Sequence, residues 1–147
     1  VMPNGLIRVY WVYTEDNFSS EKIVSATSKT TKGIEFTLDP GYRIDDGYVD
    51  FEVIKAEEGD WRAVMSYTPH YLPDTPQSIF YATSRDGLDW EFNKERLTEK
   101  DFSYLDPTGV PLDNGTYLLV MSGATNEMAD PMKNPNYQLF TAQLILP

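Results

Sequence analysis

Short segments in which hydrophobic and polar residues alternate recur along the whole chain, and polar turns separate them. Alternation with a period of two is typical of strands that bury one face, and no stretch shows the longer period of an amphipathic helix. Gly, Asn and Asp punctuate the segments at short intervals, as turns require. The pattern predicts an all-β chain with strands at residues 6–13, 22–27, 34–38, 49–55, 61–67, 78–83, 89–93, 108–112, 116–122 and 137–145.

The strand pattern repeats about every 55 residues. The segment that begins at Ile79 repeats the one that begins at Ile23, and Leu105-Asp106-Pro107 repeats Val49-Asp50-Phe51. A turn glycine followed by a strand recurs at three positions, which are Gly5, Gly59 and Gly115. Repetition at this period, with a sheet pattern inside each unit, is the sequence sign of a β-propeller.

Each complete unit holds four antiparallel strands, so the chain is predicted to contain about two and a half blades. They form a single partial propeller domain over residues 1–147, with an incomplete blade at 1–38, a complete blade at 49–93 and an incomplete blade at 105–147. A propeller normally needs at least about four blades to close. Further blades are therefore expected to complete the ring, either in a longer protein or through a homo-oligomer, and the isolated chain is expected to be inactive.

The connections between strands are of two kinds. Those from the first to the second strand and from the third to the fourth strand of a unit are tight turns, whereas the others are long. Because strands in a blade run up and down, all the long connections emerge at one end of the blades. Binding and catalysis usually reside in long loops on a rigid scaffold, so this end is the predicted functional face. The long connections are residues 14–21, 39–48, 68–77, 93–104 and 123–136.

Three carboxylates near the predicted functional face are the candidate catalytic groups. Asp50 and Asp106 open the innermost strands of successive blades, and Glu52 points to the same side of its strand as Asp50. Innermost strands converge on the propeller axis, which would bring these carboxylates within several ångströms of one another. Such a pair suits acid and base catalysis at a glycosidic bond. The alternative is that each aspartate only accepts hydrogen bonds from backbone at a strand start. This alternative is stronger for Asp106 than for Asp50 and Glu52, because an Asp-Pro step such as Asp106-Pro107 commonly opens a turn.

Four ring side chains in or beside the long loops are the candidate sugar-binding groups. His70, the only histidine, could hydrogen-bond a sugar hydroxyl, and exposed tyrosine rings stack on sugar rings. The alternative is that the histidine is an ordinary loop residue and that the tyrosines pack loops onto the scaffold. The candidates are His70, Tyr71, Tyr48 and Tyr104.

Composition narrows the classes of partner and cofactor. The net charge of −11 argues against a nucleic-acid partner and against attraction to an anionic membrane. The absence of cysteine excludes thiol catalysis, disulfides and cysteine-bound zinc, and leaves the compartment open. Asp45 and Asp46 offer oxygen ligands to calcium, but six to eight such ligands are needed, and a solvated turn is the favoured interpretation. No cofactor is predicted, and carbohydrate is the predicted ligand class.

Three segments carry a resemblance to known families. They are 49–62, with Val49-Asp50-Phe51-Glu52-Val53 and Gly59-Asp60-Trp61-Arg62; 79–90, with the turn Ser84-Arg85-Asp86-Gly87; and 105–117, with Leu105-Asp106-Pro107 and Asp113-Asn114-Gly115. With these segments the chain resembles the five-bladed propeller glycosidases of the arabinanase and β-xylosidase type, glycoside hydrolase family 43. It is similar, less closely, to the sialidase-like proteins with Asp-box repeats, since no arginine triad for a sialic acid can be identified.

The resemblance implies a glycoside hydrolase whose acidic catalytic groups come from the first strands of different blades. Asp50 and Asp106 match that placement, and Glu52 is nearby. The rival interpretation is a non-catalytic module, in which half-propellers assemble into a full ring and bind carbohydrate or another protein.

Overall fold

The structure, a computed structural model, describes residues 1–14, 21–67, 76–99, 102–125 and 137–146. Every regular element in these ranges is a β-strand, and the ten strands form three antiparallel sheets. The all-β prediction is therefore confirmed. None of the described ranges contains a helix that is long and apolar enough to cross a membrane.

The middle sheet has four strands in the order of the chain. They are β4 (Tyr48–Glu57), β5 (Asp60–Tyr67), β6 (Ser78–Ser84) and β7 (Trp90–Phe92). Gly59 lies in the tight turn between β4 and β5 with φ of +74°, a conformation that side-chain-bearing residues rarely adopt. Alternate residues of β5, Trp61, Ala63 and Met65, are buried on one face, as the period of two predicts.

The first and third sheets have three strands each within the described residues. The first sheet consists of β1 (Arg8–Thr14), β2 (Glu21–Ser28) and β3 (Phe36–Leu38) in that order. The third sheet consists of β8 (Phe102–Pro111), β9 (Tyr117–Thr125) and β10 (Gln138–Leu144) in that order. By the repeat, the first sheet corresponds to the last three strands of the middle sheet, and the third sheet to its first three.

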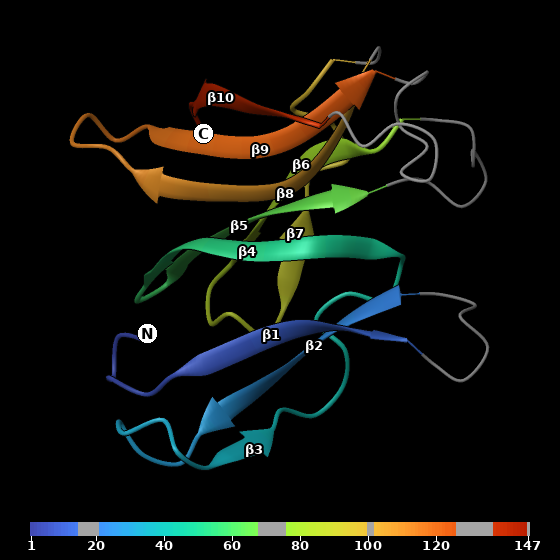
Figure 1. The fold of residues 1–147 in the computed structure, drawn as a ribbon. Coiled ribbons are helices and arrows are strands. Elements are labelled where there is room, and N and C mark those ends of the chain that lie inside the picture. The colour runs from blue at the N-terminus through green and yellow to red at the C-terminus, as the bar shows by residue number, and fades with distance from the viewer. Residues whose placement is uncertain (15–20, 68–75, 100–101, 126–136, 147) are drawn as a thin grey trace.

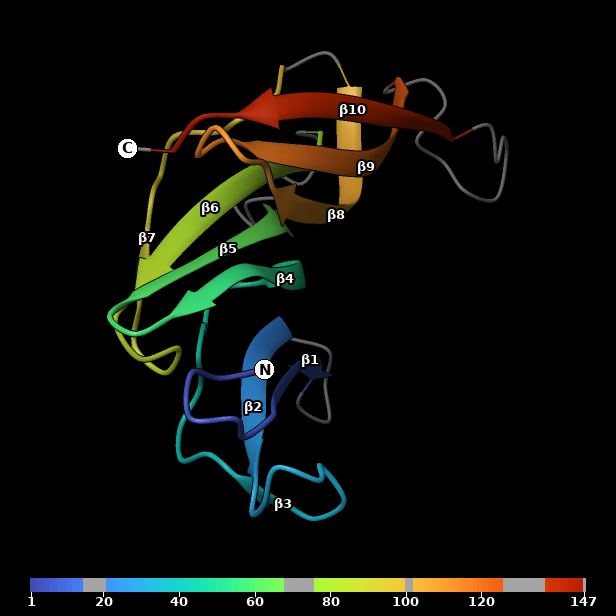
Figure 2. The same cartoon turned by 90° about the vertical axis from the view of Figure 1, so that its left-hand side faces the viewer.

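The three sheets follow one another through the molecule, as Figures 1 and 2 show, with β4 between β1 and β8. The innermost strands β4 and β8 are neighbours, because the amide of Asp106 donates to the carboxylate of Asp50. Four-stranded antiparallel sheets that pack in sequence around an axis are the blades of a β-propeller. The described residues therefore form a partial propeller.

Cross-strand register repeats from sheet to sheet. The strand pairs β1–β2, β5–β6 and β9–β10 have the same register. A residue at a given position of one pair therefore lies opposite the equivalent residue in the other two pairs. The equivalent pairs include Trp11 with Val24, Met65 with Phe80, and Met121 with Phe140. These pairs identify which residues of the three blades correspond, even where the connecting loops differ in length.

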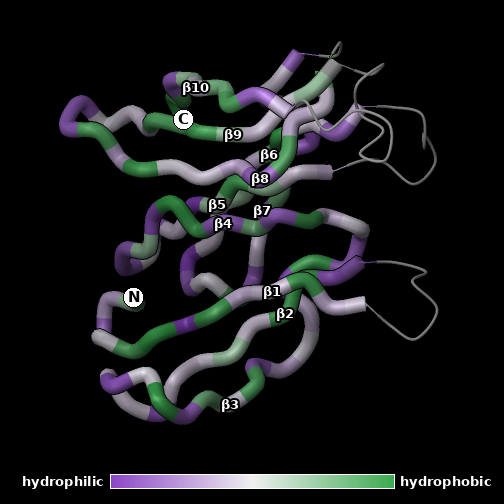
Figure 3. Tube along the Cα trace, in the orientation of Figure 1, coloured by the Kyte–Doolittle hydropathy of each residue, from purple (hydrophilic) through white to green (hydrophobic). Residues whose placement is uncertain are grey.

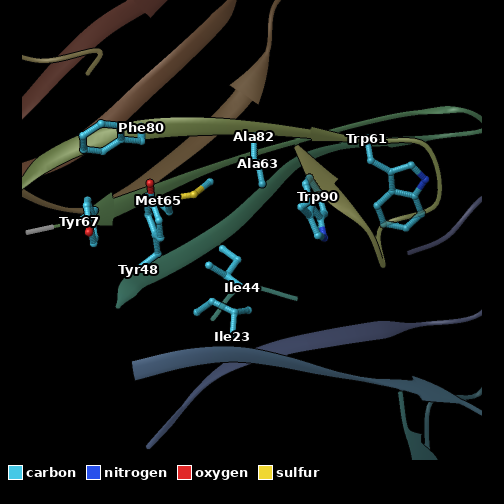
Figure 4. Packing of buried hydrophobic residues seen from close by; sticks show 10 residues of the cluster. All are labelled: Ile23, Ile44, Tyr48, Trp61, Ala63, Met65, Tyr67, Phe80, Ala82 and Trp90. Carbon is cyan, nitrogen blue, oxygen red and sulfur yellow. The ribbon is translucent and has the colours of Figure 1, made fainter. Parts of the chain in front are cut away.

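Two hydrophobic clusters fill the interfaces between the sheets. In the first cluster, shown in Figure 4, Ile23 and Ile44 of the first unit meet Met65 and Phe80 of the middle sheet. In the second cluster, residues of the other face of the middle sheet, including Ile79, meet the third sheet. Burying one such aliphatic side chain contributes about 1.5–3 kcal/mol. The core therefore lies between blades, and the middle sheet is buried on both faces.

A polar contact also joins the first unit to the middle sheet. Arg8, Tyr10 and Arg43 donate to the carbonyl oxygens of residues 86, 87 and 88, over 2.6, 2.8 and 2.9 Å respectively. Burial raises the pKa of Tyr10, although Arg8 acts in the opposite direction. Two side chains of β1, together with Arg43 from the connection 39–48, thus hold the tight turn of the middle sheet.

The start of β8 differs from the strand predicted at 108–112. The Asp106-Pro107 step suggested a turn, but it lies inside a strand that begins at Phe102. Asp106 and Pro107 together lie opposite one residue of β9, which is a β-bulge. A bulge leaves one residue outside the ladder, so proline, which has no amide hydrogen, is tolerated there.

Candidate functional site

Asp50 and Asp106 occupy the same position in neighbouring blades, each at a bulge of an innermost strand. Their φ angles are +52° and +49°, and within the described residues they are the only non-glycine residues with positive φ. Bulges of this kind usually have glycine in the left-handed conformation. A side-chain-bearing residue there costs about 1–2 kcal/mol, less for Asp because its carboxylate can bond locally. Strain retained at two equivalent positions indicates that the aspartate side chain itself has a role.

Each of these carboxylates accepts a hydrogen bond from a serine of the adjacent strand in its own sheet. Ser66 donates to Asp50, and Ser122 donates to Asp106 over 3.0 Å. The Asp50 carboxylate accepts a second bond, 3.2 Å long, from the amide of Asp106. The two residues are therefore linked by a bond from the backbone of Asp106 to the side chain of Asp50. They lie where the innermost strands β4 and β8 meet.

A second link between the same two strands lies two residues further on. The hydroxyl of Thr108 donates to the carboxylate of Glu52 over 3.4 Å, and the two residues are 56 positions apart, as are Asp50 and Asp106. Glu52 and Asp106 are exposed, whereas Asp50 is half-buried. Asp50 and Glu52 of β4 thus each contact β8, at Asp106 and Thr108 respectively.

Glu52 also lines a groove of about 320 Å³ between the first unit and the middle sheet. Arg8, Tyr10 and Phe51 line the same groove. Arg8 and Tyr10 are already engaged there with the carbonyl oxygens of residues 86 and 87, and Arg8 also pairs with Asp39 at 3.3 Å, so Glu52 is the carboxylate candidate of this groove.

Ser66, Ser122 and Gln77 belong to the site and were not identified from the sequence. Ser66 is fully buried, and its hydroxyl also accepts a 3.0 Å bond from the side-chain amide of Gln77. The signal was present in the repeat, because Val64-Met65-Ser66 and Val120-Met121-Ser122 match residue for residue. A serine at the same place in both copies, opposite an aspartate at the same place in both copies, would have identified the pairs.

Tyr48 lies in the core, and its ring contacts differ from the sugar contact that the sequence suggested. The side chain is 8% exposed, and its ring stacks on Tyr67 with centroids 4.1 Å apart and on Phe92 at 5.2 Å. Neighbouring aromatic rings therefore already cover it, which fits the packing alternative.

Tyr104 is half-buried against Phe102 and Phe140, with ring centroids 6.1 and 5.5 Å away. Desolvation raises the pKa of Tyr104, and the negative charge of Glu99 acts in the same direction. The hydroxyl therefore stays protonated and able to donate over a wide pH range. His70 and Tyr71 lie outside the described residues.

One carboxylate of the acidic turn at Asp45 and Asp46 forms an ion pair. Asp45 contacts the ammonium group of Lys22 at 3.1 Å. In the described ranges, no group of three or more His, Asp or Glu side chains is arranged to hold a metal ion. Where the structure describes the chain, the site is thus built from carboxylates, hydroxyls and amides.

Comparison with known proteins yields similar structures but no similar sequences. Neither the family models nor the curated protein sequences match the chain. The GH32 β-fructofuranosidase BmSUC1 of Bombyx mori has a TM-score of 0.69 at 18% identity, covering 97% of this chain and 32% of that chain, and a mutant of it in complex with sucrose gives the same values. The GH93 α-L-arabinofuranosidase of Fusarium graminearum, in complex with arabinobiose, has a TM-score of 0.69 at 13% identity and covers 97% of this chain and 42% of that chain.

These similarities support the propeller fold of glycosidases at the level of architecture. At identities of 18% and 13% they support the fold, but they do not assign a role to any residue of this chain. The chain spans between a third and somewhat over two fifths of the length of these enzymes.

Proposed function

We propose that this chain is part of a carbohydrate-active propeller of the glycoside hydrolase type. The observation that carries the proposal is the pair of strained bulge aspartates, Asp50 and Asp106, linked by a 3.2 Å bond between neighbouring innermost strands. The fold shared with GH32 and GH93 glycosidases adds support. The closer resemblance to glycoside hydrolase family 43 is part of the same proposal.

In this mechanism two carboxyl groups act on one glycosidic bond. One carboxylic acid gives its proton to the glycosidic oxygen as the bond to the anomeric carbon breaks, and water supplies the hydroxyl that the carbon gains. In the inverting form the second carboxylate accepts the remaining proton of that water directly. In the retaining form the second carboxylate first bonds to the anomeric carbon, and the first residue, now a carboxylate, accepts the proton of the water that releases the sugar. Asp50, which two donors hold in place, suits the base or nucleophile, and the exposed Asp106 or Glu52 suits the acid.

The sugar-binding roles of His70, Tyr71 and Tyr104 remain part of the proposal, whereas Tyr48, whose ring Tyr67 and Phe92 already cover, is left out of it. Tyr104 has the best support among the described residues, because it is half-buried and lies on β8, the strand that carries Asp106. No metal takes part in the proposed chemistry.

The test is hydrolysis of a panel of aryl-glycosides by the wild-type protein with its ring of blades completed and by Asp50→Asn in the same assembly. Removing a general acid or base is expected to lower the rate about 100-fold or more. Asp89→Asn is the matched control, because Asp89 is an exposed carboxylate near the opposite, tight-turn end of the blade. Equal turnover by wild type and Asp50→Asn would remove Asp50 from catalysis.

One observation favours a second candidate, a non-catalytic carbohydrate-binding or protein-interaction module. The serine bond repeats in both blades at the same spacing, as a structural link between strands would. In that case no aryl-glycoside is turned over, yet titration calorimetry with oligosaccharides detects binding. Turnover that Asp50→Asn abolishes would exclude this second candidate.

A further inference from the structure

Hydrophobic residues occur along strands of the first and third sheets, as the colours of Figure 3 indicate, and several of them are exposed. The first end face comprises Trp11, Tyr13, Val24 and Leu38, of which Trp11 is 41% and Leu38 63% exposed. These four side chains line a groove of about 510 Å³, together with Asp39, Pro40, Gly41 and Tyr42. Large contiguous apolar surfaces of this kind mark interaction sites.

The first end face is equivalent to surfaces that are buried inside the molecule. Trp11, Met65 and Met121 occupy the same position of the three sheets, as their cross-strand pairs show. Met65 is fully buried in the first cluster and Met121 is 3% exposed in the second, each packed against the preceding blade. Trp11 alone of the three is exposed. The first end face therefore corresponds to the surface that, in the other two sheets, packs against the preceding blade.

The opposite relation holds at the other end of the molecule. Ile23, Ile79 and Leu139 are also equivalent, because they pair with Val12, Ser66 and Ser122 respectively. Ile23 and Ile79 are fully buried, whereas Leu139 is 79% exposed. Together with Val110 and Leu118, Leu139 forms the last end face, which is one that receives a following blade.

Each internal interface joins one face of each type. The first cluster contains Ile23 and Met65, and the second contains Ile79 and Met121. The chain therefore carries one exposed face of each type, and each is the partner that the other lacks. A second copy of the same chain supplies both.

We propose that two copies of this chain associate head to tail, with the last end face of one copy packed on the first end face of the other. Leu139 then lies against Trp11 as Ile79 lies against Met121. Both contacts form at once when the two copies close a ring of six sheets, which is within the range of known propellers. The proposal does not depend on carbohydrate activity, since it rests only on the repeat and on the exposed faces.

The first test is the mass of the chain in solution, measured by light scattering after size exclusion at micromolar concentration. Twice the chain's 16.8 kDa is expected, and it should persist on dilution and in 0.5 M salt, which screens the repulsion between two copies of charge −11. A monomer would overturn the proposal, and so would an open polymer whose mass grows with concentration.

The second test distinguishes head-to-tail pairing from symmetric pairing. The chain has no cysteine, so Trp11→Cys and Leu139→Cys provide the only thiols for a short bismaleimide cross-linker. Head-to-tail pairing predicts cross-linked dimers after the two variants are mixed and exchanged, and none with either variant alone. Cross-linking of either variant with itself would refute the head-to-tail arrangement.

Charge substitutions provide a matched pair of variants. Trp11→Glu and Leu139→Glu both replace a side chain that is exposed in the single copy, so each should fold, as its circular dichroism spectrum would show. Each variant alone is expected to give a monomer, because both of its interfaces would carry a buried charge. A mixture of the two keeps one interface with unaltered Leu139 and Trp11, so it is expected to form a dimer weaker than that of the wild type, and dimers of either variant alone would contradict the proposal. Val1→Glu, at an exposed position outside both faces, is the control that should remain dimeric.

Discussion

Asp50→Gly and Asp106→Gly make the same substitution at nearly the same backbone conformation, yet we expect them to change the free energy of unfolding by different amounts. Both residues have positive φ, so glycine relieves similar strain at both sites, about 1–2 kcal/mol at most. Glycine also gives the unfolded chain more freedom, which offsets about 0.4–1 kcal/mol of that gain. The backbone terms therefore nearly cancel and are common to the two variants.

The hydrogen bonds that are lost differ between the two sites. Asp106→Gly removes a bond from Ser122 at an exposed position, worth about 0.5 kcal/mol at the low end of the usual range. Asp50→Gly removes the bond from the fully buried Ser66 and the bond from the amide of Asp106. Bonds to a charged group are worth about 1.5–3 kcal/mol each. Asp106→Gly should thus be nearly neutral, and Asp50→Gly should lose about 3 kcal/mol.

The assay is reversible urea unfolding followed by tryptophan fluorescence, with thermal unfolding as a second measurement. A loss of 3 kcal/mol corresponds to a fall in Tm of roughly 6–12 °C for a chain of this size. Asp50→Asn and Asp106→Asn serve as controls, because asparagine retains an acceptor oxygen and tolerates the left-handed conformation.

Equal losses for the two glycine variants, within about 0.5 kcal/mol, would refute the reasoning. They would mean that the amide of Asp106 and the buried hydroxyl of Ser66 do not stabilise the Asp50 carboxylate. A larger loss for Asp106→Gly would refute it as well. It would mean that the Asp106 carboxylate of the third sheet stabilises the fold more than the Asp50 carboxylate of the middle sheet.

The tight turn of the middle sheet provides another comparison, since a Cβ at Gly87 would lie 2.7 Å from the Tyr10 hydroxyl oxygen, whereas Gly59 has φ of +74° and open space. Calorimetry should show Gly87→Ala losing about 2–5 kcal/mol and Gly59→Ala about 1 kcal/mol, and equal losses would contradict the packing argument. Partial burial acts to raise the pKa of Asp86, but hydrogen bonds from the two following amides and from a serine hydroxyl outweigh it, so the folded pKa lies below the ordinary value of about 3.9. The resulting stability is present above pH 4 and is lost as the pH falls through the folded pKa. In urea titrations, the difference in the free energy of unfolding between wild type and Asp86→Asn should therefore shrink between pH 6 and pH 2. A constant difference would contradict this role of the Asp86 carboxylate. Arg43→Met removes a buried guanidinium that bonds three carbonyls, and a loss of about 2–4 kcal/mol is expected, whereas a loss under 0.5 kcal/mol would show that this contact does not hold the blades together.

The fold was predictable because the repeat of about 55 residues contains the strands and turns of one propeller blade. Turn glycines such as Gly59 and Gly115 recur at the spacing of a blade and have φ of +74° and +79°, which few other residues adopt. The strand β5 was predicted at 61–67 and is observed at Asp60–Tyr67, where both of its faces are buried between blades. By contrast, Asp106-Pro107 suggested a turn because a bulge with a left-handed aspartate has no signature in the local sequence, and it becomes visible only through the register of the partner strand.

The candidate site was predictable only in part, for a similar reason. Asp50 and Asp106 stand out because carboxylates at matching strand starts are uncommon and chemically informative. Ser66 and Ser122 do not stand out, since serine is common in strands and becomes meaningful only when its partner aspartate is known. Contacts such as that of Arg43 with residue 88 join positions 45 apart, and nothing in the local sequence indicates them.

The two bulge aspartates share one conformation but have different neighbours, and this difference bears on function. Asp50 accepts from the backbone of the following blade, so its carboxylate is part of the contact between blades. Asp106 occupies the same position on the last innermost strand of the described residues, where no following sheet supplies such an amide. In the proposed ring the next blade is the first sheet of the other copy, whose described strands lack a counterpart of β4. The carboxylate of Asp106 would then face an opening beside the axis, which is where a ligand could approach it.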